Sequence, residues 1–210
     1  ARTVEEWQHV FDNDEDVFAE TYRKGLQSLD HPQVVYDDLV VELKHPDLGR
    51  IREPSVLVKM SRTPGSATRP VPDVDEHGSE LRSLAAPPQS VQRELGPTGG
   101  LPLAGVTVVE LGTFYAGPFG STMLADQGAR VIKIEPLDGD PIRFQMPMPE
   151  SAGVRVTQGK KSIAVNVFAP EGREIVTQLI RRADIVLHCF RGGVAERMGL
   201  DAESMQALNP

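Results

Sequence analysis

Cysteine is almost absent from this chain of 210 residues. Cys189 is the only one, which excludes an intrachain disulfide and is compatible with a reducing compartment. Basic residues are also scarce relative to acidic ones, with 22 Lys and Arg against 30 Asp and Glu. Because a nucleic-acid-binding protein normally carries a basic face, the net charge of −8 argues against that class, and we expect no nucleic-acid partner.

Long apolar runs and metal-ligand patterns are missing too. No uninterrupted apolar stretch reaches the roughly 20 residues of a transmembrane helix, so we expect no membrane partner. The opening residues, ARTVEEWQHVFDNDED, lack the basic end and apolar core of a secretory signal. We therefore expect a cytoplasmic protein. The histidines and Cys189 show no zinc-ligand spacing, so we expect no metal.

Residues 103–135 show the pattern of a strand, a loop, a helix and a second strand. Val106–Leu111 and Arg130–Glu135 are short and rich in β-branched apolar residues. Between them lies a helical pattern for which Gly128 offers a C-terminal cap. Such a β-α-β unit opens a doubly wound sheet, which binds ligands at the carboxyl ends of its strands. We therefore expect Thr113–Gly117 to border a ligand site.

The rest of the second half also alternates strands with helices. We expect strands at Ser162–Val167 and Asp184–Phe190, and between them a helix that opens at Ala169–Gly172. Short helices follow Gly193 and Ala202. The expected fold class is α/β, with an incomplete doubly wound, Rossmann-like parallel sheet preceded by a small α+β portion.

The first half is less regular. A helical pattern covers residues 3–29, and its start matches a capping box formed by Thr3 and Glu6. Expected strands and helices after it are a strand at Val34–Leu43, a turn at His45–Gly49, a return strand near Ile51, a strand at Ser55–Ser61 and a short helix at Glu80–Leu84. The chain divides into an α+β segment (1–84), a Pro/Gly-rich linker (85–100) and a truncated sheet portion (101–210).

Several stretches carry a family signature when taken in order. They are PLAGVTVVELGTFYAGP (102–118), LADQGARVIKIE (124–135), GDPIR (139–143), GKKSIAVNV (159–167) and PEGREIVTQLIRRADIVLHCFRGGVAERMGL (170–200). This set resembles the amino-terminal part of the family III CoA-transferases, the CaiB/BaiF type that includes formyl-CoA transferase and α-methylacyl-CoA racemase.

The first half resembles the carboxyl-terminal part of the same family, through WQHV (7–10), DHPQVV (30–35), VVELKHPDLGRIREPSV (40–56) and VPDVDEHGSELRSL (71–84). A carboxyl-terminal part that precedes an amino-terminal part indicates a tandem fusion of two family copies. A circularly permuted or engineered piece is the alternative.

The resemblance implies that coenzyme A, as an acyl-CoA substrate, contacts a defined set of side chains. These are Phe114, Tyr115, Val165, Cys189, Phe190, Arg191 and Arg197. The two arginines would pair with phosphate oxygens, and Val165 and Phe190 would flank the adenine. Tyr115 would lie near the thioester.

The residues alone allow plainer interpretations of the same positions. Val165 and Phe190 fit strand core, and Arg197 fits a solvated helix face. Cys189 fits a small apolar filler at a strand end. The pair Lys160 and Lys161, outside that set, could reach a phosphate group, but such a pair is more typical of the protein surface.

The activity that the resemblance implies is transfer of CoA between an acyl-CoA and a carboxylic acid, in an interlocked homodimer. Racemisation of a 2-methylacyl-CoA and a non-catalytic half that supports assembly are the alternatives. The family's catalytic aspartate lies downstream of the Asn-Pro at 209–210, so we assign no catalytic residue within these 210 residues.

Overall fold

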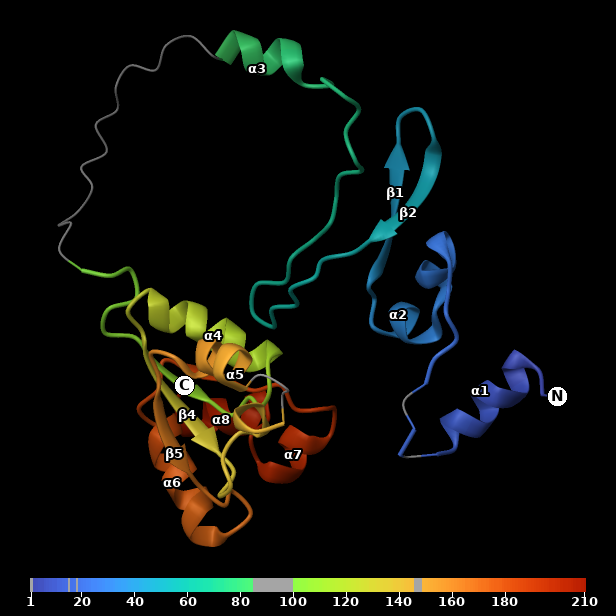
Figure 1. Ribbon diagram of the computed structural model, residues 1–210. Coiled ribbons are helices and arrows are strands. Elements are labelled where there is room, and N and C mark those ends of the chain that lie inside the picture. The colour runs from blue at the N-terminus through green and yellow to red at the C-terminus, as the bar shows by residue number, and fades with distance from the viewer. Residues whose placement is uncertain (1, 15, 18, 85–99, 146–148) are drawn as a thin grey trace. The chain divides into compact units, whose positions relative to one another are not determined.

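The computed structural model describes residues 2–14, 16–17, 19–84, 100–145 and 149–210. The chain divides into two compact units, Ala1–Val91 and Gln92–Pro210 (Figure 1). Except for Gly100, the linker expected over 85–100 lies outside the described residues. Within the described ranges, no helix is long and apolar enough to cross a membrane.

A four-stranded parallel sheet forms the centre of the second unit, in the order β5-β4-β3-β6. Its strands are β3 (Thr107–Glu110), β4 (Arg130–Glu135), β5 (Lys161–Ala164) and β6 (Ile185–Leu187). The sheet grows from β3 through β4 to β5, and the chain then returns to place β6 on the other side of β3. The topological switch point therefore lies between β3 and β6, which confirms the expected doubly wound α/β sheet.

Helices cover both faces of this sheet (Figure 1). They are α4 (Ala116–Asp126), α5 (Pro149–Thr157), α6 (Pro170–Ile180), α7 (Val194–Met198) and α8 (Ala202–Leu208), and a short η2 (Pro141–Arg143) precedes α5. Neighbouring residues of a strand point to opposite faces. Val108 accordingly packs in a cluster with residues of α4, whereas Val109 packs with Val176 and Ile180 of α6.

Glycine fixes the end of α4 and the approach of α6. The chain after α4 turns at Gly128 with φ of 99°, as the cap prediction required. A Cβ at Gly172 would lie 2.0 Å from the carbonyl oxygen of Asn166, so only glycine lets α6 pack this closely on the segment after β5. The helix α5 was not predicted, because its stretch carries no strong apolar stripe.

The first unit begins with α1 (Val4–Asp12), whose Thr3–Glu6 capping box is confirmed. The expected helix over 3–29 is wrong beyond Asp12. The Asn13 side chain donates to the carbonyl oxygen of His9 at 2.6 Å, an alternative to helix continuation. A short η1 (Gly25–Asp30) follows.

The hairpin of the first unit pairs β1 (Val40–His45) with β2 (Gly49–Pro54). The turn and return strand were predicted correctly, but the start of the first strand was not. Residues Pro32–Tyr36 form helix α2, because His31 caps the Gln33 N–H at 3.0 Å and proline stands at the first helical position. The strand expected at Ser55–Ser61 is absent, whereas the short helix is present as α3 (Gly78–Leu84).

Candidate functional site

A pocket of about 360 Å³ opens in the second unit where β3, β4 and β5 end. Its walls come from Leu111 and Thr113 after β3, Ile134–Leu137 at the end of β4, Val165–Phe168 after β5, Phe190 after β6, and Val194 and Met198 of α7. Most of these side chains are apolar. The pocket thus lies at the edge where a doubly wound sheet binds its ligands.

The structure brings two of the seven expected contact residues together in this pocket. They are Val165, which is 5% exposed, and Phe190. Val165 also belongs to the buried core cluster and Phe190 packs against that cluster, so the core interpretation holds for both, although each follows the end of its strand. Phe114 and Tyr115 lie in the loop between β3 and α4 and are 41% and 48% exposed. These two aromatic residues border the sheet edge without lining the pocket.

The other three expected residues, Cys189, Arg191 and Arg197, are exposed and also do not line the pocket. Cys189 lies beside the loop after β3, with its Sγ 3.8 Å from the carbonyl oxygen of Thr113. Arg197 belongs to α7, whose Met198 does line the pocket. The two arginines therefore flank the side of the pocket that follows β6.

The ring of Phe190 is held in place by its neighbour His188. The two rings are stacked with centroids 4.9 Å apart, and the Phe190 N–H donates to His188 Nδ1 at 3.3 Å. The stack restrains the ring of Phe190, which also lines the pocket.

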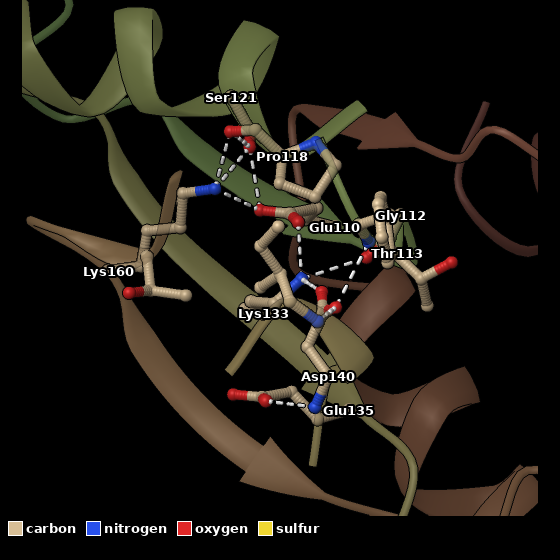
Figure 2. Close-up of polar contacts among 12 residues, drawn as sticks. Glu110, Gly112, Thr113, Pro118, Ser121, Lys133, Glu135, Asp140 and Lys160 are labelled. Atoms are coloured by element: carbon tan, nitrogen blue, oxygen red, sulfur yellow. Dashed lines mark hydrogen bonds and ion pairs between the residues drawn. The ribbon is translucent and has the colours of Figure 1, made fainter. Parts of the chain in front are cut away.

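Behind the loop after β3 lies a buried network of four charged side chains (Figure 2). Lys133 Nζ is 2.8 Å from Glu110 Oε1 and 2.7 Å from Asp140 Oδ2. Lys160 Nζ is 2.7 Å from Glu110 Oε2. All four side chains are at most 1% exposed, and their two positive and two negative charges balance. Removing any one of them would leave a buried charge without compensation.

The expectation that Lys160 lies on the surface is wrong. Its ammonium also donates to the Pro118 carbonyl oxygen at 2.6 Å and to Ser121 Oγ at 2.8 Å. Burial lowers the pKa of Lys160, and the hydrogen bond to Glu110 opposes that shift. This lysine joins the start of β5 to the first turns of α4.

Glu135 ends β4 and borders both the pocket and the network. Arg143 donates to it through two nitrogens, at 2.7 and 2.6 Å, and Ser162 Oγ donates at 2.5 Å. The Arg143 hydrogen bonds, with help from Ser162 and the Asp140 N–H, lower the pKa of Glu135 from 4.5 to about 2. Glu135 is therefore an anion at every ordinary pH.

The sequence contains a signal for this network that is independent of the family resemblance. Glu110 and Lys133 are charged residues that have an apolar neighbour on each side, within the strand patterns. A charge in such a position is rarely left unpaired, so each one predicts a partner of opposite sign. Across the described residues, no group of three or more His, Cys, Asp or Glu side chains is arranged to hold a metal ion.

The fold and the pocket define an α/β protein of the doubly wound class with a ligand site at its carboxyl edge. The sequence model of CoA-transferase family III matches residues 1–78 and 103–210, so the chain belongs to that family.

Relatives with known activities support the assignment. The chain is 44% identical over 115 residues to the succinyl-CoA–D-citramalate CoA-transferase of Chloroflexus aurantiacus, a match that covers 52% of this chain and 28% of that protein. It is 41% identical over 120 residues to the succinate–glutarate CoA-transferase of Agrobacterium fabrum, covering 52% of this chain and 30% of that protein.

A crystal structure of a point mutant of Rv3272 from Mycobacterium tuberculosis is also similar, with 32% identity and a TM-score of 0.51. That match covers 53% of this chain and 31% of the other. The matched regions thus span less than a third of the length of each of these relatives.

Proposed function

We propose that the second unit holds the nucleotide end of a CoA thioester, in a protein that transfers CoA between an acyl-CoA and a carboxylic acid. The observation that carries this proposal is the apolar pocket at the carboxyl edge, lined by Val165 and Phe190, in a member of CoA-transferase family III. The printed names of both relatives are those of CoA-transferases, which favours transfer over racemisation.

The chemistry of the pocket suits adenine. An adenine ring is flat and largely apolar on its faces, so it stacks well on a fixed aromatic ring and packs against an aliphatic side chain. Phe190 supplies the first surface and Val165 the second. Among the described residues that line this pocket, Glu135 carries the one acidic side chain, and Arg143 already compensates that charge.

The phosphates of CoA require cations at the mouth of the pocket. Arg191 and Arg197 are exposed on the side that follows β6 and would donate charge-assisted hydrogen bonds to phosphate oxygens. We assign the phosphates to this side of the pocket because it carries the two exposed arginines.

The thioester end is assigned to the loop between β3 and α4. The Tyr115 ring stacks on Phe119 with centroids 5.6 Å apart and an interplanar angle of 9°. This contact fixes the direction of the ring of Tyr115, which is 48% exposed, and its hydroxyl would meet a substrate carbonyl or carboxylate. Tyr115 thereby serves as an orienting group, and the described residues supply no nucleophile to the proposal.

Isothermal titration calorimetry with CoA, AMP and pantetheine tests the proposal. We expect CoA and AMP to bind and pantetheine alone to bind far more weakly, because the pocket recognises the nucleotide end. Phe190→Ala should weaken CoA binding about tenfold, the loss of one stacking contact of about 1.4 kcal/mol.

Phe144→Ala is the matched control, since Phe144 is a 56% exposed aromatic of the same unit that does not line the pocket. Equal affinities for CoA in the wild type and in Phe190→Ala would overturn the adenine assignment. Absence of CoA binding to the wild type would overturn the proposed function of the pocket.

We also propose that the protein self-associates and that it acts in the cytoplasm. The names of further relatives, 36% identical, describe α and β subunits of a succinyl-CoA–L-malate CoA-transferase, which supports assembly. Sedimentation analysis tests this part, since a monodisperse monomer at micromolar concentration would contradict it.

A further inference from the structure

The loop that joins β3 to α4 is held at two points by charged side chains from the β4 region. Lys133 Nζ donates to the carbonyl oxygen of Gly112 at 2.8 Å (Figure 2). Asp140 Oδ1 accepts the N–H of Phe114 at 3.0 Å. Both side chains are buried, and of the two bonds the one to Gly112 is buried and the one to Phe114 is partly buried.

The backbone that they hold is strained. Phe114 has φ of +68°, a left-handed conformation that is uncommon for a residue with a bulky side chain. Such a conformation persists only where surrounding interactions over-determine it. The bonds at Gly112 and Phe114 bracket the segment and supply that constraint.

Asp140 is itself fixed from three sides. Its Oδ2 lies 2.7 Å from Lys133 Nζ, its N–H donates to Glu135 Oε2 at 2.8 Å, and its Oδ1 also accepts the Ile142 N–H at 3.0 Å. The side chain is 0% exposed and does not line the pocket. Any effect of the Asp140 side chain on a ligand is therefore indirect, and the loop is the element it holds that borders the pocket.

We propose that Asp140 is a positioning residue for the CoA site. Together with Lys133, it holds Gly112–Phe114 in the strained shape that turns Thr113 into the pocket wall and sets Tyr115 at the thioester end. This inference rests on the proposed function for its ligand, but the loop constraint itself is measurable without any ligand.

Amide hydrogen exchange tests the constraint directly. In the wild type, the Phe114 N–H should exchange at least about a hundredfold more slowly than an unprotected amide, which is the protection of a bond with about 3 kcal/mol of opening free energy. Asp140→Ala should remove most of that protection. Asp140→Asn should remove less of it, because the amide oxygen can replace Oδ1 as the acceptor even though the ion pair with Lys133 is lost.

The matched control is Asp184→Ala. Asp184 Oδ2 accepts the Thr107 N–H at 2.8 Å, so this variant also removes a bond from a carboxylate to a backbone N–H, but at the amino end of β3. It should leave exchange at Phe114 unchanged. Unchanged exchange of the Phe114 N–H in Asp140→Ala would overturn the proposal. Unprotected exchange of that N–H in the wild type would also overturn it, and this measurement does not depend on whether Asp140→Ala folds.

CoA affinity tests the link to the site, measured well below the melting temperature of every variant. Asp140→Ala should weaken CoA binding about tenfold, because the loop loses one hydrogen bond and is less well ordered before the ligand binds. Asp184→Ala should bind CoA as the wild type does. A merely structural role would lower the melting temperature in both variants and leave both affinities unchanged, which would overturn the positioning role.

A double variant separates strain from side-chain loss. Glycine adopts the left-handed conformation without steric cost, so in a Phe114→Gly background the further loss caused by Asp140→Ala should shrink. Full additivity of the two changes would contradict the proposal. A wild type that fails to bind CoA would defeat the proposed function alone, since the exchange experiment still decides the loop constraint.

Discussion

Lys133 and Asp140 form an ion pair of 2.7 Å in which neither side chain is more than 1% exposed. The same ammonium reaches Glu110 at 2.8 Å and the Gly112 carbonyl oxygen at 2.8 Å. One lysine of β4 thus ties the end of β3, the loop after it and the loop after β4 into one unit. The conformation of the loop that borders the proposed CoA site therefore depends on the buried side chains of Lys133 and Asp140, which do not line the pocket.

Replacing Lys133 with Met should destabilise the second unit strongly. It would leave the carboxylates of Glu110 and Asp140 buried and short of a cation, a change that typically costs about 3 to 5 kcal/mol. Urea unfolding measured by circular dichroism gives the free energy of unfolding. Arg155→Met is the control: the Arg155–Asp126 pair is 42% and 48% exposed, and such pairs contribute about 1 kcal/mol or less. Comparable losses in the two variants would show that burial of the network does not matter.

Glu135 should make the second unit acid-sensitive. Its pKa falls from 4.5 to about 2 on folding, which corresponds to about 3 kcal/mol of stability at neutral pH. Because the folded pKa is the lower one, this stability is present above about pH 4.5 and is lost as the pH falls toward 2. Glu135→Gln should be less stable near neutral pH and should lose less stability over that interval. Free energies of unfolding measured at several pH values check this. If the free energy of unfolding changed with pH equally in the wild type and in Glu135→Gln, the prediction would be refuted.

Gly172→Ala should be poorly tolerated. The new Cβ would lie 2.0 Å from the Asn166 carbonyl oxygen, so α6 must move away from the segment that follows β5. Overpacking of this kind costs about 1 to 3 kcal/mol and would also shift the pocket wall. Gly120→Ala is the control, because its Cβ would meet nothing nearer than 4.0 Å and alanine favours a helix by about 1 kcal/mol. Thermal melts should move in opposite directions, and a harmless Gly172→Ala would disprove the close packing.

Tyr115→Phe should separate CoA binding from turnover in the proposed transfer reaction. The ring keeps its stack on Phe119, so CoA affinity should stay at the wild-type value. Turnover should fall about tenfold if the hydroxyl orients a substrate oxygen through one hydrogen bond. Steady-state kinetics with CoA binding measured in parallel checks this, and unchanged turnover would remove the polar role of Tyr115.

Much of the sheet was predictable because its signals are local. Strands β3 and β4 are short β-branched runs with glycines near their ends, and β4 was predicted at Arg130–Glu135, the bounds that the structure has. The carboxyl-edge site followed from the β-α-β pattern, and the structure brings Val165 and Phe190 to one pocket there.

What sequence reasoning missed depends on partners far along the chain. From the sequence, Lys160 is typical of a surface lysine. Its burial depends on Glu110, which lies 50 residues earlier in the chain and pairs with it in the fold. The strained φ of Phe114 has no sequence signal, because aromatic residues rarely adopt it and the constraint comes from Asp140, 26 residues later. In the first unit, the β-branched pair Val34 and Val35 favoured a strand. The structure has helix α2 there instead, because His31 caps its amino end.

The most direct test is to locate the adenine of bound CoA by nuclear Overhauser effects. The account predicts contacts from the adenine protons to the methyl groups of Val165 and to the ring of Phe190. Contacts instead at the amino edge of the sheet, near Asp184 and Met205, or an absence of CoA binding, would contradict it.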